Sequence, residues 1–385
     1  MWCAGLRVRN HARSRRATLV RNLVVNRVQH VHAGLTQMHT IRVPASFDRC
    51  QHLFANYRKP YRITSQRFTL AGFMSDRTGR MKKYIGFGKK VFLKHIYAPL
   101  NKELVRITEG KLKRRAYQLS NFHRIVRWIR LLRGSKVADL VEFFGQSQST
   151  VNRDCKLLSH LFIATQYVKW VHPMATGSPE YLTNRGSGNF LGYPNAVYAG
   201  DIVQVQIPKP TLKQSFFYSY KHKCHSLGFM VAVDSRGLAR LVAGPCGGVV
   251  NDVTFMKNSK LEDKLKSMVA TGDTILYDGA FKSLYADLYT TPIISRGSNT
   301  YMALHPSTVN LHDKCHRSAR VIVENYFGGL KSLFPIWRYY QWNAVESSIH
   351  FRVCVGLYQI FLLFEAALRP IKCQNDDCFV CYHTL

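Results

Sequence analysis

Apolar and polar side chains alternate over residues 195–207, and this alternation predicts a half-buried β-strand. Val203, Val205 and Ile207 share one face of the strand, and the glutamines between them share the other. Asp201 has the same parity as the valines, so it is predicted on the apolar side. An ionised carboxylate is costly there unless a cation or hydrogen-bond donors compensate it. Asp201 is therefore a candidate for a functional role.

Two more acids occupy unusual positions in the second half of the chain. Asp278 ends a short apolar run, 274–277, and Glu324 borders an amphipathic helix with Arg320 one turn earlier. Acids on separate elements can converge on divalent cations, because hard cations prefer oxygen ligands. Two such ions can clamp the attacking and leaving oxygens of a phosphodiester displacement. For each acid taken alone, a helix cap or an ion pair is the simpler alternative.

The other patterns of the second half predict both strands and helices. Two strands, 229–233 and 238–242, are joined by a tight turn. A helix is predicted over 252–266, with Asp252 as its N-cap rather than as a metal ligand. A long apolar helix is predicted over about 344–368. Together these elements predict an α/β fold in which helices flank both faces of a mixed sheet.

The first half contains a helix followed by two shorter helices that flank a tight turn. The helices are predicted over 119–132, 136–144 and 148–158, with a glycine-containing turn at 145–147. This layout is that of an all-α helix-turn-helix domain, whose second helix enters the major groove of DNA. A helical hairpin that only covers the α/β domain is the alternative. The side chains left free to bond base edges or phosphates are Lys136, Gln148, Ser149, Asn152, Arg153 and Lys156.

The positive charge of the chain is concentrated in its first half. The 385 residues carry a formal net charge of +33, and 46% of them are hydrophobic, which is enough for a sizeable core. Residues 1–138 hold 31 Lys and Arg but only four acids, so +27 of the charge lies there. Such an excess is expected of a protein that binds a polyanion such as double-stranded DNA. For residues 1–47 alone, a basic disordered tail without a defined target is the alternative.

Changes in composition divide the chain into six segments. Turn-forming residues between 172 and 195 mark the main boundary. The predicted segments are a basic, disordered arm (1–47), a basic irregular region (48–115), the helix-turn-helix domain (116–171), a linker (172–195), the α/β domain that carries the three acids (196–370) and a Cys-rich tail (371–385).

Several shorter signals bear on location and on metal binding. The ten cysteines follow no compact pattern and are predicted to be reduced thiols of a cytosolic or nuclear protein. Residues 373–383 hold three Cys and one His, which suit zinc, although unliganded thiols are the alternative. The arm 1–47 has the composition of a nucleic-acid-binding arm and also of a mitochondrial transit peptide. The basic run 111–115 fits a nuclear address or a phosphate patch. The longest apolar run, 353–364, is too short to span a membrane.

The acids stand in segments that resemble one known family. Residues 197–340, a little under half the chain, are similar to the PIF/Harbinger-type nuclease domain of the DDE transposase superfamily. The family usually has Gly-Thr after its first acid, where this chain has Ile202 and Val203. The last matching segment is the most specific. The matching segments are Ala199–Pro208 around Asp201, Gly248–Ser259 around Asp252, Asp278–Phe281 followed by Thr291-Pro292, and Arg320–Phe334 around Glu324.

The resemblance implies a ribonuclease H-like fold and a metal-dependent DNA endonuclease or transposase. Asp201, Asp278 and Glu324 would be catalytic and would hold two Mg²⁺ or Mn²⁺ ions. Asp252 would be an auxiliary residue, and Arg320 would orient Glu324 or contact a DNA phosphate. The implied partners are double-stranded DNA at transposon ends and a separate DNA-binding protein. Whether the protein forms a homo-oligomer is left open. The resemblance implies a nuclear location and no membrane partner. The alternatives are a domesticated DNA-binding protein with an inactive nuclease fold and, on charge and aromatic content alone, a single-strand or RNA binder.

Overall fold

A computed structural model describes residues 72, 75, 79–108, 119–278, 289–290, 306–341 and 344–365. They belong to one compact unit, Ile63–Leu385. The predictions for the arm 1–47, the basic run 111–115 and the Cys-rich tail 371–385 fall outside the described residues.

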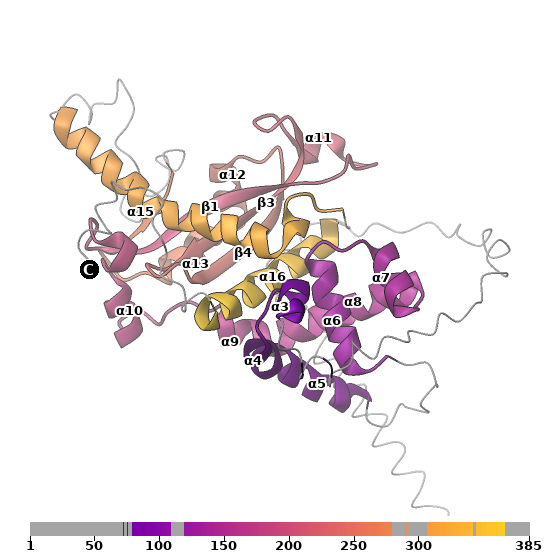
Figure 1. Ribbon diagram of the computed structural model, residues 1–385. Helices are drawn as coiled ribbons and strands as arrows, with labels where there is room; N and C mark the ends of the chain where they lie inside the picture. Colours follow the sequence, from indigo (N-terminus) through magenta and orange to yellow (C-terminus); the bar gives the residue numbers. More distant parts are fainter. Residues whose placement is uncertain are drawn as a thin grey trace, which may run out of the picture. The chain divides into compact units, whose positions relative to one another are not determined.

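Helices dominate the first half of the described chain, and the sheet occupies the second half (Figure 1). The helical elements before the sheet are α3 (Arg80–Ile85), α4 (Lys89–Val91), the π-helical turn η2 (Phe92–Tyr97), α5 (Ala98–Thr108), α6 (Asn121–Leu132), α7 (Val137–Phe144), α8 (Gln148–Phe162), the π-helical turn η3 (Ile163–Tyr167), α9 (Val168–Trp170), α10 (Pro179–Asn184) and the 3₁₀ turn η4 (Gly188–Phe190). The strands are β1 (Ala196–Gln206), β2 (Tyr218–Ser219), β3 (Cys224–Val233), β4 (Ala239–Gly247), β5 (Thr274–Leu276) and β6 (Tyr289–Thr290). The later helices are α11 (Gln214–Phe217), α12 (Asp252–Asn258), α13 (Leu261–Lys266), α15 (Pro306–Leu333), η6 (Pro335–Trp337) and α16 (Ala344–Phe364).

The sheet is mixed, and β1 lies in its interior. β1 pairs antiparallel with β3, which pairs antiparallel with β4. On its other edge β1 pairs parallel with β5, and β5 pairs parallel with β6. This order is compatible with the expected ribonuclease H-like fold. The predicted parity of β1 is confirmed, because Val203, Val205 and Ile207 are buried whereas Gln206 is exposed.

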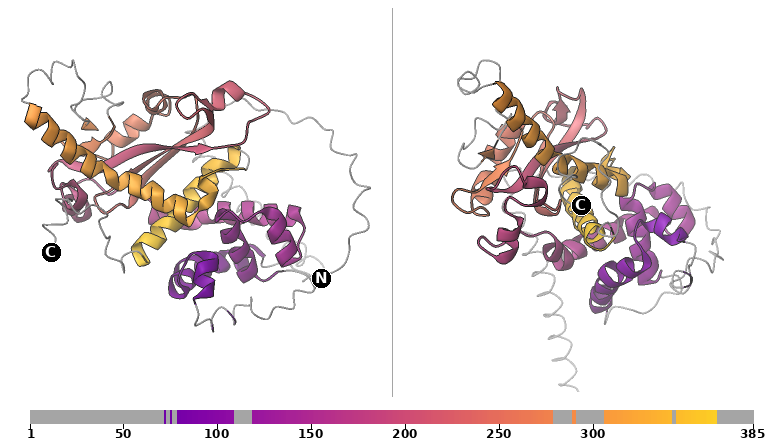
Figure 2. Two further views of the ribbon diagram at one scale, coloured as in Figure 1. Left: turned by 45° about the horizontal axis from the view of Figure 1, so that its top comes forward. Right: turned by 60° about the vertical axis from the view of Figure 1, so that its left-hand side comes forward.

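Each face of the sheet has its own hydrophobic cluster, as the two-residue alternation of strands requires. On one face, Ala199, Val203 and Val205 of β1 pack in a cluster with residues of α15 and α16. On the other face, Tyr198 and Met230 pack with residues of α12 and α13. Figure 2 shows α15 running along the sheet with α16 beside it. Helices therefore flank both faces, as predicted.

The turn between β3 and β4 is stabilised by one buried carboxylate. Asp234 Oδ1 accepts hydrogen bonds from the backbone N–H groups of Arg236 and Leu238, each at 2.9 Å. Gly237 adopts a left-handed φ of +77°, a conformation that glycine takes without steric cost. The hairpin predicted from the sequence is confirmed, with strands a few residues longer than predicted.

The last helix, α16, corresponds to the predicted long apolar helix. Its segment Glu346–Phe364 is long and apolar enough to cross a membrane by length and composition alone. In the structure 67% of that segment is buried, and α16 contacts β4, α8 and α15. A buried core helix passes the same test, and these contacts give α16 that role here.

Helices α6, α7 and α8 lie where the sequence predicts helices. Leu140 and Phe144 of α7 are buried against Val151 and Leu158 of α8, and Gly145 ends α7 with a left-handed φ of +61°. These helices share one hydrophobic cluster with the sheet face that carries α15 and α16. The designation of α7 and α8 as a DNA-binding helix-turn-helix domain stays a prediction.

Two arginines of α6 serve the interior instead of a DNA surface. Arg124 and Arg127 are buried and both pair with Asp154 of α8, at 2.8 and 2.5 Å. The sequence analysis counted the positive charge of these arginines toward a polyanion partner. Their charge is used to compensate a buried carboxylate, because a buried ion is tolerated only when it is paired.

The region 48–115, expected to be irregular, contains helices within its described part. From Lys89 to Thr108 the elements α4, η2 and α5 follow one another without a break. Gly86 ends α3 in a left-handed conformation, so it separates helices instead of preventing them. Pro99 is the second residue of α5, one residue beyond the end of the π-helical turn, where the regular hydrogen-bond ladder is already altered. The glycines and the proline of this segment by themselves indicate irregular structure, so its helices were not predicted from the sequence.

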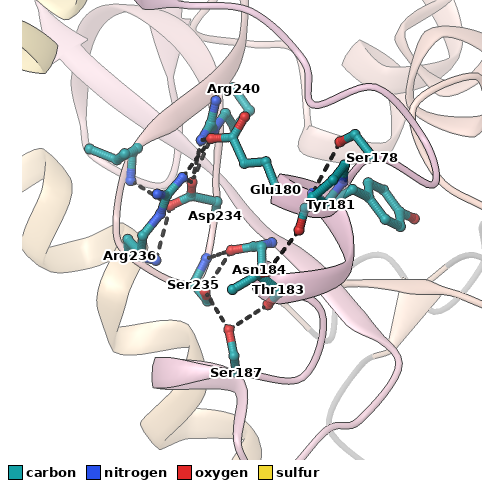
Figure 3. A network of polar contacts seen from close by, with 12 residues as sticks. Ser178, Glu180, Tyr181, Thr183, Asn184, Ser187, Asp234, Ser235, Arg236 and Arg240 are labelled. Atoms are coloured by element: carbon teal, nitrogen blue, oxygen red, sulfur yellow. Dashed lines mark hydrogen bonds and ion pairs between the residues drawn. The ribbon is translucent and has the colours of Figure 1, made fainter.

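The segment 172–195, expected to be a linker, contains α10 and η4. Ser178 caps α10 by accepting a hydrogen bond from Tyr181 N, and Pro179 occupies the first helical turn. Asn184 accepts hydrogen bonds from both the backbone and the hydroxyl of Ser235 (Figure 3). This polar network fastens α10 to the β3–β4 turn, so the segment is an ordered part of the fold.

Candidate active site

Asp201 lies in the middle of β1 on the face that packs against α15. It pairs across the sheet with Val231 of β3, and its side chain is 24% exposed. The backbone N–H of Ile202 donates to Asp201 Oδ1 at 2.8 Å. The strand therefore holds this carboxylate on the half-buried face that its parity predicts.

The neighbouring strand β5 brings Asp278 close to Asp201. Asp278 follows β5, which is parallel to β1, and its side chain is 51% exposed. Gly200 permits the close approach, because a Cβ there would lie 2.4 Å from a ring carbon of Tyr277. A larger residue next to Asp201 would push the two strands apart.

Arg320 of α15 contacts all three predicted catalytic acids. Its Nη2 donates to Asp201 Oδ2 at 3.3 Å and to Glu324 Oε1 at 3.4 Å, and its Nη1 lies 3.7 Å from Asp278 Oδ1. The contact with Glu324 joins residues one helical turn apart. Arg320 is 13% exposed, so the guanidinium is largely enclosed. The structure thus brings Asp201, Asp278 and Glu324 together around one cation.

Asp252 is near these acids but does not cap its helix. The N-cap of α12 is Asn251, whose side-chain oxygen accepts from Thr254 N at 2.8 Å. Asp252 is the first residue of the helix, so its predicted capping role is wrong. Its carboxylate is close enough to Asp278 for the charge of Asp278 to raise its pKa. The helix expected over 252–266 also breaks at Lys260, whose left-handed φ of +50° separates α12 from α13.

The first prediction follows from this correction. Replacing Asn251 by Ala should cost about 1 kcal/mol of unfolding free energy, because the helix loses its cap. Replacing Asp252 by Ala should cost less, since its carboxylate is partly buried beside other acids. Urea denaturation of both variants and the native chain measures the difference. Equal losses in the two variants would contradict the assignment of the cap to Asn251.

The acids affect one another's ionisation. Burial raises the pKa of Asp201; Arg320 and the hydrogen bond from Ile202 N oppose this rise, whereas Asp252 and Asp278 add to it. Burial also raises the pKa of Asp252, Lys221 and His222 oppose that rise, and Asp278 adds to it. Arg320 is the largest compensating influence on Asp201, so the site depends on this cation when no other is bound.

The carboxylates suit a divalent cation in their chemistry. Mg²⁺ and Mn²⁺ prefer oxygen ligands, and every acid in this cluster offers them. Within the described residues, however, no three His, Cys, Asp or Glu side chains are grouped closely enough to hold a metal ion. The guanidinium of Arg320 contacts Asp201, Asp278 and Glu324 instead. A metal ion held by these acids would compete with Arg320 for their oxygens.

The predicted DNA-contacting residues lie on the exposed side of α8 and at the start of α7. Exposed side chains are found for Lys136, Gln148, Ser149, Asn152, Arg153 and Lys156. Lys156 lies 3.5 Å from Glu346 of α16, so part of its charge is already paired. No contact within the described chain joins these residues to the acid cluster.

Lys221 and His222, which lower the pKa of Asp252, are not among the residues predicted from the sequence. They belong to the run Tyr220–Lys223 between β2 and β3. The mixture of aromatic and basic residues was a usable signal. Its position beside the acids depends on how the β2–β3 segment packs, which periodicity does not reveal.

Comparison with known families agrees with this geometry. Residues 200–359 match the family model of the DDE superfamily endonuclease. The match supports a DDE-type transposase domain over this range, which contains Asp201, Asp252, Asp278 and Glu324. No curated protein and no solved structure matches the chain.

Proposed function

We propose that this protein is a Harbinger-type transposase, or an endonuclease derived from one, that cleaves and transfers DNA phosphodiesters. The family match supports a transposase-like nuclease function. The observation that carries the proposal is the meeting of Asp201, Asp278 and Glu324 on the guanidinium of Arg320. Acids from three separate elements meet on one cation where a metal site of this class is expected.

The proposed reaction requires Mg²⁺ or Mn²⁺, with Asp201, Asp278 and Glu324 as ligands and Asp252 nearby. Metal held by these carboxylates would supply Lewis-acid stabilisation of the attacking and leaving oxygens. The protein contributes a rigid strand that fixes Asp201 and a long helix that fixes Glu324. Arg320, released from the acids, is placed to bind a DNA phosphate through charge-assisted hydrogen bonds.

A second candidate is a domesticated DNA-binding protein whose nuclease fold is a scaffold. The pairing of Arg320 with the acids favours it, because a stable ion-pair cluster needs no metal. The Ile202-Val203 sequence after the first acid also favours it. Incubation of a labelled duplex with Mg²⁺ or Mn²⁺, with and without chelator, separates the two candidates. Metal-dependent nicking supports the enzyme, and its absence under both metals supports the scaffold.

The proposal includes binding of double-stranded DNA by α7 and α8, with α8 in the major groove. Six exposed polar or basic side chains on these helices support it. We also propose that the target is transposon ends, that a separate DNA-binding protein takes part, and that the protein forms a homo-oligomer. The proposed location is the nucleus, with the mitochondrion as the alternative. These parts rest on the resemblance and on the +33 charge.

A prediction tests the role of α8. Replacing Arg153 by Ala should weaken DNA binding by about 1–3 kcal/mol and relax the sequence preference, if Arg153 contacts a base. Fluorescence anisotropy with specific and unrelated duplexes at several salt concentrations measures both effects. Exposed Arg106 of α5, replaced by Ala, serves as the control. Unchanged affinity of the Arg153 variant for every duplex would favour the alternative in which the hairpin only covers the nuclease domain.

A further inference from the structure

The segment between β1 and β3 is strongly and uniformly basic. Residues 207–223 contain four lysines, one histidine and no acid. Among the described residues, Lys209, Lys213 and Lys223 form no ion pair, and all three are exposed. Their positive charge is therefore free to meet an external anion.

A short turn within this segment presents an aromatic ring to solvent. Tyr218 and Ser219 pair antiparallel with His225 and Cys224, so that residues 220–223 form the connection between β2 and β3. The ring of Tyr220 is 73% exposed. The Tyr220 ring lies edge-on to Tyr218, with 5.2 Å between the ring centroids, and the next three residues, Lys221, His222 and Lys223, are basic and exposed.

The residues on either side of this turn contact the segment that leads into α12. Val249 N donates to Phe216 O at 3.3 Å. A Cβ at Gly248 would lie 2.4 Å from Phe217 O and 2.5 Å from Ser226 Oγ. The two segments are therefore in close contact at Gly248, four residues before Asp252. This contact brings the chain around β2 next to the segment that carries Asp252.

The charge influence on Asp252 agrees with this placement. Burial raises the pKa of Asp252, and Lys221 and His222 are the cations that oppose the rise. The turn thus lies close enough to the cluster for its charge to act there.

We infer that the turn Tyr220–Lys223 binds an unpaired DNA strand next to the phosphate that is cut. This inference rests on the proposed nuclease function. Lysines contact the backbone phosphates, and the Tyr220 ring stacks on a base. In a duplex the faces of the bases are covered by their neighbours, so stacking requires a nucleotide outside the helix. The turn therefore selects DNA that is open or frayed at the cleavage site.

Binding of the full chain to two labelled DNAs in EDTA tests the inference. One DNA is a blunt duplex, and the other is the same duplex with a single-stranded tail. Tyr220→Ala should weaken binding to the tailed DNA about tenfold and leave binding to the blunt duplex nearly unchanged. Tyr220→Phe should retain the affinity, because it keeps the ring. Lys221→Ala should weaken binding to the tailed DNA and lower its salt dependence by about one phosphate contact.

Two exposed residues provide matched controls. Leu212→Ala removes an apolar side chain of the same segment that is 68% exposed, and Lys102→Ala removes an exposed lysine of α5. Neither should distinguish the two DNAs. Equal affinities of Tyr220→Ala and the native chain for the tailed DNA would overturn the inference. Displacement of the tailed DNA by polyglutamate of equal charge would assign the turn to an acidic polypeptide instead.

The outcomes separate this inference from the proposed function. If nicking requires metal but Tyr220→Ala binds tailed DNA normally, the nuclease proposal stands and the role of the turn is overturned. If Tyr220→Ala loses the tailed DNA but no metal supports nicking, the turn binds strands in a protein that does not cut them.

Discussion

Replacing Asp278 by Asn should abolish metal-dependent nicking while leaving the fold intact. Asp278 contributes a carboxylate to the cluster around Arg320, and Asn is nearly the same size without the charge. Losing a ligand to a catalytic metal costs several kcal/mol of transition-state stabilisation, which corresponds to about a thousandfold or more in rate. Binding of DNA by α7 and α8 should persist, since these helices do not touch Asp278. A nicking assay with Mn²⁺ and an anisotropy assay in EDTA measure the two effects.

Thermal melting tests whether Asp278→Asn loses nicking activity because it no longer binds the metal ion. Asp278 raises the pKa values of both Asp201 and Asp252 through like-charge repulsion. Without metal, Asp278→Asn should therefore melt at the same temperature as the native chain or slightly higher. Mn²⁺ should raise the melting temperature of the native chain, because a ligand that binds only the folded state stabilises it. The variant should lose that increase.

Asp263→Asn is the matched control for this experiment. Asp263 is an exposed acid of α13 outside the cluster, so its variant should nick DNA and respond to Mn²⁺ like the native chain. If native and Asp278→Asn chains melt alike with and without metal, Asp278 is not a ligand. The scaffold alternative would then account for the fold.

Local patterns predicted much of the sheet and of the helices that cover it. The alternation in β1 gave the orientation of Asp201 because side chains of a strand point to opposite faces in turn. The helical spacing around Glu324 placed Arg320 one turn away, and the structure confirms their contact. Both features depend only on residues that are close together in the sequence, so the local pattern of apolar and polar residues is enough to predict them.

Ion pairs between residues far apart in the chain could not be predicted from such local patterns. The sequence could not show that Arg320 contacts Asp201 and Asp278 as well, because these contacts join three elements far apart in the chain. The partnership of Arg124 and Arg127 with Asp154 was hidden for the same reason. Charges that appear suited to DNA were in part internal ion pairs.

Replacing Arg320 by Gln should destabilise the metal-free protein by about 2 kcal/mol. The change leaves the half-buried Asp201 without its main compensating cation, and breaking a buried ion pair costs up to several kcal/mol. The lower part of that range applies because Asp278 and Glu324 are more than half exposed. For a chain of this size the melting temperature should fall by roughly 2–4 °C. Melting curves in EDTA measure it.

The dependence of this loss on pH provides a second test of the same cause. The folded-state pKa of Asp201 is already raised, and removing Arg320 removes the largest influence that lowers it. A carboxyl group with a raised folded pKa costs stability above that pKa, and the cost disappears as the pH falls through it. The deficit of Arg320→Gln should therefore be largest at neutral pH and shrink in acidic buffer. A deficit independent of pH would point to lost packing instead of unpaired charge.

Metal should compensate for the missing guanidinium. In the native chain the guanidinium of Arg320 contacts all three acids, so a metal ion held by them would compete with it. In Arg320→Gln that competition is absent, and Mn²⁺ should raise the melting temperature more than it does in the native chain. Arg317→Gln, an exposed arginine one turn earlier on α15, should behave like the native chain. If Mn²⁺ stabilises the Arg320 variant no more than the native chain, the guanidinium and the metal do not share one site, and the acids around Arg320 form a structural ion-pair cluster.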